Sequence, residues 1–255
     1  MARANRRGRN KRYRVLMTIF IVIALVFAFY LSSGLFFKIT DVRVEGMSVY
    51  TDGEIRSASG FETGENIFMI NKNSAARAIT NRFPYVERVR IRRELPGTVV
   101  IEITESAPVA MLEHKGEFWL INTRGVLLES IPVNMAPELA EILGVETIAP
   151  VVGQNVRFDD PDLSKIDPLL ELLTVLSRKG LLDDVAWVDM TYLSNIIFAY
   201  TDRFTVEVGF PDHIESKIVW LMESLPKLDE KSPGSRGRFY LDTAHEDNSV
   251  RFIPE

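Results

Sequence analysis

Few side chains in this 255-residue sequence have the type and spacing that catalysis or metal binding needs. The three histidines, His114, His213 and His245, are far apart and show no H-x-x-x-H spacing for zinc. No nucleophile-elbow, dinucleotide-binding or P-loop motif occurs. The absence of cysteine excludes thiol nucleophiles, zinc–thiolate sites and disulfides. We therefore expect no catalytic residue, no metal site and no cofactor.

Two pairs of adjacent carboxylates, Asp159/Asp160 and Asp183/Asp184, are the other candidates for acid–base chemistry. Side chains of sequence neighbours diverge in regular structure, so neither pair predicts a catalytic dyad. We interpret them as loop and capping residues. Glycosidase carboxylates can lie far apart in sequence, so a membrane-anchored cell-wall enzyme with dispersed carboxylates is kept as an alternative.

Arginines recur at every second position in the middle of the chain, at Arg88, Arg90 and Arg92. The favoured interpretation is a solvated strand face whose charges pair with Glu102 and Glu105. The second interpretation is a docking face for an acidic partner protein. These three arginines are therefore secondary docking candidates.

A basic tail and an uncharged segment begin the chain. Residues 15–37 carry no charged side chain, and a helix of that length spans roughly 34 Å, enough for a hydrocarbon core of about 30 Å. Residues 1–14 contain seven basic residues and no acidic one, which predicts a cytoplasmic N-terminus by the positive-inside rule. A cleaved signal peptide, ending near Ser32-Ser33-Gly34, is the alternative to this uncleaved transmembrane helix. The rest of the chain is acidic, which argues against nucleic-acid binding.

Residues 38–106 predict the element order β-α-α-β-β. Thr51 and Glu54 have the spacing of a capping box, which predicts a helix over Asp52–Ser59. A short strand precedes this helix, and a second helix is expected over about residues 74–82. Two alternating runs on either side of Leu95-Pro96-Gly97 predict a β-hairpin with a type II turn.

The alternation also predicts the register of this hairpin. A two-residue turn would place Arg92 opposite Ile101 and mix the polar and apolar faces. We expect one extra residue, as in a bulge, which aligns Ile91 with Ile103 and Arg92 with Glu102.

Residues 107–255 predict a mostly antiparallel β-rich domain with flanking helices. Helices are expected over about residues 137–143, 168–179 and 213–225. Strands are expected over about residues 118–122, 126–128, 185–190, 196–201, 204–210, 238–242 and 249–252. The polar stretch 228–237 is expected to be a surface loop.

Several phrases of the chain carry a family resemblance. They are Gly64-Glu65-Asn66-Ile67-Phe68, Phe83-Pro84-Tyr85-Val86, Leu95-Pro96-Gly97-Thr98, Glu105-Ser106-Ala107-Pro108-Val109-Ala110 and, more loosely, Leu120-Ile121-Asn122-Thr123-Arg124-Gly125, Pro150-Val151-Val152-Gly153 and Tyr240-Leu241-Asp242. The order β-α-α-β-β resembles a POTRA domain, and the phrases resemble the FtsQ/DivIB family of bacterial cell-division proteins. Ser106 departs from the family, which typically has arginine there.

The resemblance implies an α+β protein of four parts. These are a cytoplasmic basic tail (1–14), a transmembrane helix (15–37), a POTRA domain (38–106) and an FtsQ/DivIB-type β domain (107–255). The implied function is a non-enzymatic divisome scaffold in the cytoplasmic membrane at the division septum, linking early and late division proteins. Its implied partners are FtsB/DivIC-like and FtsL-like single-pass proteins, septal cell-wall synthases and membrane lipid, without nucleic acid. A POTRA-type chaperone or translocation component is another alternative.

The last strand gives the best binding hypothesis. A strand at a sheet edge has unpaired N–H and C=O groups, and residues 249–253 have little to protect such an edge. A partner peptide could add a strand there, with Val250 and Phe252 as side-chain anchors; alternatively, the strand only pairs internally. In the FtsQ/DivIB family the late strands bind FtsB/DivIC, and the resemblance implies the contact residues Tyr240, Asp242, Ala244, Val250 and Phe252.

Overall fold

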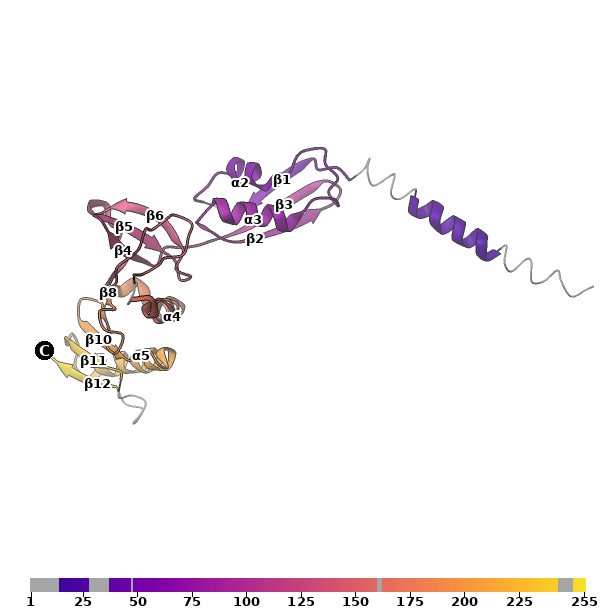
Figure 1. Cartoon of the computed structure of the whole chain (residues 1–255). Helices are drawn as coiled ribbons and strands as arrows, with labels where there is room; N and C mark the ends of the chain where they lie inside the picture. Colours follow the sequence, from indigo (N-terminus) through magenta and orange to yellow (C-terminus); the bar gives the residue numbers. More distant parts are fainter. Residues whose placement is uncertain (1–13, 28–36, 47, 160–161, 243–249) are drawn as a thin grey trace, which may run out of the picture. The chain divides into compact units, whose positions relative to one another are not determined.

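The computed structural model describes residues 14–27, 37–46, 48–159, 162–242 and 250–255. The chain divides into two compact units (Figure 1). The first unit comprises Met1–Thr80 and Val86–Glu105, and the second comprises Asn81–Tyr85 and Ser106–Glu255.

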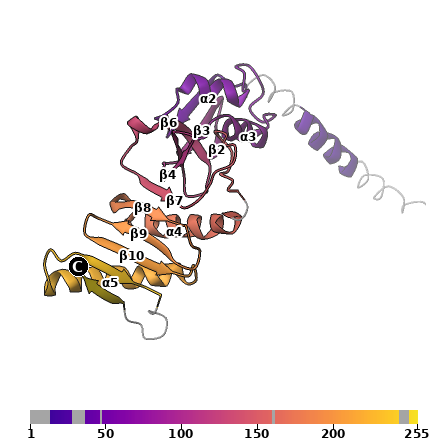
Figure 2. The same ribbon diagram turned by 60° about the vertical axis from the view of Figure 1, so that its left-hand side comes forward.

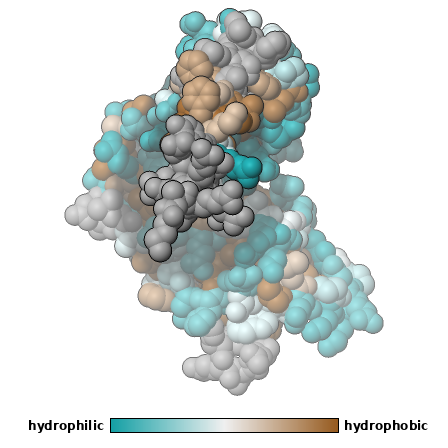
Figure 3. All heavy atoms as spheres, turned by 90° about the vertical axis from the view of Figure 1, so that its right-hand side faces the viewer, coloured by the Kyte–Doolittle hydropathy of each residue, from teal (hydrophilic) through white to brown (hydrophobic). Residues whose placement is uncertain are grey.

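The predicted membrane segment is described only in part. Residues 14–27 form a helix, whereas residues 1–13 and 28–36 lie outside the described residues. No helix of the described ranges is both long enough and apolar enough to cross a membrane. Much of the described surface that Figure 3 shows is hydrophilic, with hydrophobic side chains exposed in places.

The first unit has the predicted order β-α-α-β-β. Its elements are β1 (Asp41–Glu45), α2 (Asp52–Ser59), α3 (Lys72–Arg82), β2 (Val86–Glu94) and β3 (Thr98–Glu105). The sheet order is β1-β3-β2, in which β3 is parallel to β1 and antiparallel to β2. This arrangement brings the start of β1, the start of β3 and the end of β2 to the same end of the sheet.

The predicted capping box of α2 is confirmed. The Glu54 N–H donates to the Thr51 hydroxyl at 3.3 Å, and the Thr51 N–H donates to the Glu54 carboxylate at 2.8 Å. These bonds satisfy backbone groups that a helix start leaves unpaired.

We expect Thr51→Ala to cost about 1 kcal/mol of the stability of α2, because one backbone donor loses its acceptor. Faster amide hydrogen exchange in α2 would measure this loss. Thr80→Ala is the matched control, since the Thr80 hydroxyl bonds only the Ala76 carbonyl of its own helix. Equal exchange rates in the two variants would contradict the capping role.

The predicted register of the β2–β3 hairpin is wrong. Three residues connect Glu94 to Thr98, and Ile91 lies opposite Ile101 rather than Ile103. The irregularity lies at the far end of β2, between Val86 and Arg88. The error is two residues, so both isoleucines remain on the buried face. Alternation fixes which face is buried but does not distinguish registers that differ by two.

The second unit contains a nine-stranded sheet, with the order β12-β11-β10-β9-β8-β7-β4-β5-β6. Its elements are β4 (Ala110–His114), β5 (Glu117–Ile121), β6 (Leu127–Pro132), η1 (Val133–Met135), β7 (Ala140–Leu143), η2 (Asp162–Lys165), α4 (Ile166–Arg178), η3 (Leu182–Asp184), β8 (Val185–Asp189), β9 (Ile196–Tyr200), β10 (Phe204–Gly209), α5 (Ile214–Lys231), β11 (Gly237–Tyr240) and β12 (Arg251–Pro254). Neighbouring strands are antiparallel except for β10–β11, β7–β8 and β4–β7. The predicted mostly antiparallel domain with flanking helices is confirmed.

Two local predictions in this unit are wrong, and one strand was missed. The helix expected over residues 137–143 is replaced by strand β7, which lies between β4 and β8 with Ala140 and Ile142 buried. Strand β4 was not predicted at all. Helix α5 continues through Pro226 to Lys231. The first four residues of the surface loop expected over residues 228–237 are therefore helical.

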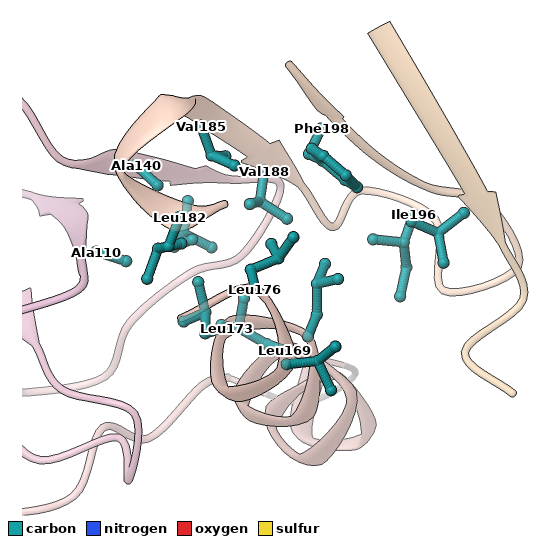
Figure 4. Close-up of a cluster of buried hydrophobic side chains, with 14 of the residues drawn as sticks. Ala110, Ala140, Leu169, Leu173, Leu176, Leu182, Val185, Val188, Ile196 and Phe198 are labelled. Carbon is teal, nitrogen blue, oxygen red and sulfur yellow. The ribbon is translucent and has the colours of Figure 1, made fainter. Parts of the chain in front are cut away.

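The core of the second unit forms where the helices pack on the sheet. Leu169, Leu173 and Leu176 of α4 are fully buried and belong to the same core as Val188 and Phe198 of the sheet (Figure 4). Helix α5 runs alongside β10, β11 and β12 (Figure 2). Its buried apolar residues Ile214, Ile218 and Leu221 belong to the same core, so one face of the C-terminal strands is covered.

Candidate functional site

Strand β12 lies at one edge of the nine-stranded sheet. It pairs antiparallel with β11, and Phe252 lies opposite Phe239. No strand of the described residues pairs with its other side. An unpaired strand side is a template for another strand, so this edge is the candidate binding site.

The opposite edge of the sheet, at β6, is partly covered. The Leu127 N–H donates to the Gln154 carbonyl at 2.8 Å, and the Gly153 N–H donates to the Leu127 carbonyl at 2.7 Å. The segment around residues 153–155 therefore supplies hydrogen-bond partners for backbone groups at the start of β6. Of the two edges, β12 is the more open to a partner strand.

The pairing with β11 determines which backbone groups of β12 are free. The Glu255 N–H donates to the Arg236 carbonyl at 3.1 Å, so the backbone of Glu255 faces β11. Backbone groups of an antiparallel strand alternate between its two sides. Ile253 and Arg251 therefore also face β11, and the N–H and C=O of Phe252 face away from it. A partner strand could bond to both groups of Phe252.

The side chain of Phe252, by contrast, packs into the unit. Its ring centroid lies 4.8 Å from that of Phe239 and 6.1 Å from that of Phe204. Val250 also packs against this core. Both residues were predicted as side-chain anchors for a partner, but in this structure their side chains hold β12 on its own sheet.

The other face of β12 carries accessible side chains. Tyr240 and Arg251 are paired across β11 and β12, and the Arg251 guanidinium lies 5.8 Å from the Tyr240 ring centroid. Ile253 lies two residues further along the same face and is 38% exposed. Arg251 and Ile253 were missed by the sequence reasoning. Alternation along residues 249–253 could have separated them from Phe252, but only the position of α5 shows which face is open.

A hydrogen bond between Arg238 and Glu207 also lies on this face. The Glu207 carboxylate accepts it and raises the pKa of Arg238 above its usual range. The guanidinium therefore stays charged, and this ion pair joins the outer faces of β10 and β11.

Asp242 is held by a lysine that has no exposed side-chain surface. The Lys217 Nζ donates to the Asp212 carboxylate at 2.7 Å, to the Phe210 carbonyl at 2.8 Å and to the Asp242 carboxylate at 3.4 Å. A Cβ atom at Gly209 would lie 2.5 Å from the Asp242 carboxyl group. Asp242 therefore has a structural role at the end of β11, while its side chain remains 63% exposed. The predicted contact residue Ala244 lies outside the described residues.

The arginines of β2 form mainly ion pairs. Arg92 Nε donates to the Glu102 carboxylate at 2.8 Å, and this bond raises the pKa of Arg92. Arg90 lies 4.0 Å from Glu102. Arg88 is exposed and has no ion pair within the described residues. The expected pairing with Glu102 is confirmed for Arg90 and Arg92, whereas the Glu105 carboxylate accepts from Ser48 and Val49 instead. A docking role for this face stays a prediction.

Catalytic groups do not converge in the part of the chain that the structure describes. His114 ends β4 and His213 precedes α5, whereas His245 lies outside the described residues. No cluster of three His, Asp or Glu side chains that could hold a metal occurs among the described residues. Asp183 and Asp184 belong to the short η3 segment. The candidate site among the described residues is therefore the free edge of β12.

Comparison with known proteins gives matches along most of the chain. The family model described as "POTRA domain, FtsQ-type" matches residues 37–106. The Cell division protein DivIB of Clostridium botulinum is 26% identical over 246 residues, which cover 96% of this chain and 93% of that protein. The DivIB of Clostridium acetobutylicum is 27% identical over 84% of this chain and 82% of its own. The Cell division protein FtsQ of Streptomyces bingchenggensis is 30% identical over 56% of this chain and 55% of its own. The chain therefore contains an FtsQ-type POTRA domain at residues 37–106 and is similar to DivIB cell-division proteins along almost its whole length.

Proposed function

We propose that the protein is a non-catalytic scaffold of bacterial cell division that captures a strand of a partner protein at β12. The outward N–H and C=O of Phe252 are the observation that carries this proposal. The cell-division names of the relatives support the process. The proposed partner is an FtsB/DivIC-like protein that itself pairs with an FtsL-like protein, and septal cell-wall synthases are further candidates.

The proposal includes the topology expected from the sequence. Residues 1–14 are a cytoplasmic tail, residues 15–37 a transmembrane anchor, and the units that follow lie outside the membrane at the division septum. The charge-free run of residues 15–37 and the basic residues before it support this topology.

Ile253→Glu tests the edge. We expect it to weaken partner binding by about tenfold or more, which corresponds to roughly 1.4 kcal/mol, because a charge would lie beside the added strand. Titration of the full-length protein with a fluorescently labelled FtsB/DivIC-like ectodomain measures the affinity. Val133→Glu is the matched control, because Val133 is an exposed apolar residue that follows the β6 edge. Unchanged affinity for Ile253→Glu would contradict the proposal.

Phe252→Ala tests partner binding and the stability of β12 together. It is expected to lower both binding and the stability of β12, since the ring contacts Phe239 and Phe204. Loss of binding in this variant alone therefore does not distinguish a partner contact from a loosened strand.

The alternative enzymatic function has a direct assay. Purified protein incubated with peptidoglycan should release no soluble fragments and form no new cross-links. Turnover that depends on the protein would overturn the non-catalytic proposal.

A further inference from the structure

One end of the first unit carries a group of apolar side chains, which we call the apolar tip: Phe37, Phe68, Met69 and Leu95. Phe68 is 45% exposed, Met69 76% and Leu95 59%. Exposed large apolar residues gathered in one place indicate a surface that contacts another apolar phase.

Backbone contacts hold part of the apolar tip beside the residue at which the apolar N-terminal run ends. The Ile67 N–H donates to the Phe37 carbonyl at 2.9 Å, and the rings of Phe37 and Phe68 lie 5.3 Å apart. The Thr40 N–H donates to the Gly97 carbonyl at 2.8 Å, which places the β2–β3 turn at the same end. The loop and the turn therefore lie where the chain enters the unit.

We infer that the apolar tip inserts into the headgroup region of the lipid bilayer. The inference rests on the proposed function, in which residues 15–37 span the membrane. Phe37 is the last residue of that span, so it lies at the bilayer surface. The headgroup regions add roughly 10–15 Å to a hydrocarbon core of about 30 Å, so each is several ångströms thick. A ring 5.3 Å from Phe37 falls within such a layer.

The flanking charges fit the same environment. Lys38 is exposed beside Phe37, whereas Arg93 is half-buried and donates from Nη2 to the Phe68 and Ile70 carbonyls, each at 3.4 Å. Cations at the edge of an apolar surface can reach lipid phosphates while their neighbours contact acyl chains. The proposed occupant is thus the outer lipid interface, not a protein partner.

The opposite end of the same unit provides an internal control. Val49 is 51% exposed, and its N–H donates to the Glu105 carboxylate at 2.9 Å. Glu105 ends β3, whereas the apolar tip lies where β3 begins. Eight residues of strand extend roughly 26 Å at about 3.3 Å per residue, so a label at Val49 stays far from the tip.

The absence of cysteine allows single labels without background. Full-length Met69→Cys, Val49→Cys and Val22→Cys would each carry a nitroxide and be reconstituted in phosphatidylcholine/phosphatidylglycerol vesicles. Power saturation with oxygen and a water-soluble nickel chelate measures the depth of each label. We expect nickel access at position 69 to be several-fold lower than at position 49.

Three results would overturn the inference. Equal nickel access at positions 69 and 49, with a buried label at position 22, would contradict the lipid contact of the apolar tip and leave the proposed anchor intact. A water-exposed label at position 22 would contradict both the proposed transmembrane anchor and the lipid contact. Protection at position 69 that rises with the protein-to-lipid ratio would assign the apolar tip to a second copy of the chain.

Discussion

Replacing Asp212 and Asp242 together by alanine is expected to destabilise the second unit by about 3–5 kcal/mol. Both carboxylates bind the ammonium group of Lys217, whose side chain has no exposed surface. Without these two carboxylates, the Lys217 ammonium group retains only one of the hydrogen-bond acceptors described above, the Phe210 carbonyl. A buried charge that loses its counter-ions costs far more than the pair contributes when intact.

Urea unfolding followed by tryptophan fluorescence would measure this loss. All three tryptophans, Trp119, Trp187 and Trp220, belong to the second unit, so the signal reports on it alone.

Lys217→Met is the matched control for the double variant. It keeps a long side chain in the same space but removes the charge, and both carboxylates it leaves are at least half exposed to water. We expect a smaller loss than in the double variant. Adding Lys217→Met to the double variant should recover part of its stability. If the double variant unfolded like the unmodified protein, the burial argument would fail.

Gly237→Ala is expected to detach β12 from β11. A Cβ atom at position 237 would lie 2.2 Å from the Ile253 carbonyl oxygen and 2.9 Å from the Phe252 ring. The first atom is backbone, so β12 itself must move. Overpacking of this kind costs about 1–3 kcal/mol, which shifts the docked strand toward the detached state by roughly 5- to 150-fold.

Two measurements would detect the detachment of β12. Amide hydrogen exchange in residues 251–255 should accelerate, and affinity for the FtsB/DivIC-like partner should fall in parallel. Gly234→Ala is the control, since its Cβ would meet no atom within 4 Å, although its φ of +73° makes alanine mildly strained there. Full affinity in Gly237→Ala, despite rapid exchange, would mean that the partner does not bind at β12.

The Lys217–Asp242 contact and the pairing of β12 with β11 lie close together, at the end of β11. Tyr240 is its last residue, and Asp242 follows and binds Lys217 of α5. The Leu241 N–H between them donates to the Glu207 carbonyl at 2.8 Å. The charged contact therefore fixes the strand on which β12 rests, which explains why a contact residue implied by the family resemblance has a structural role here.

Local sequence patterns determined much of the fold. The capping box of Thr51 and Glu54 predicted α2 with its observed bounds, and the element order of the first unit followed from it and from two alternating runs. Strands β8, β9 and β10 were predicted within one or two residues, because alternation over several residues indicates a half-buried strand. In such segments the local preference and the tertiary environment agree.

Only the tertiary structure decided β7 and the orientation of Phe252. The segment Ala140–Leu143 is too short to show a period of its own, and it is a strand because β4 and β8 pair with it on both sides. Phe252 is hydrophobic in the sequence whether it faces a partner or its own core. The packing of Phe204 and Phe239 turns its ring inward and leaves its backbone N–H and C=O at the free edge, since a strand's side chains and backbone groups point in different directions.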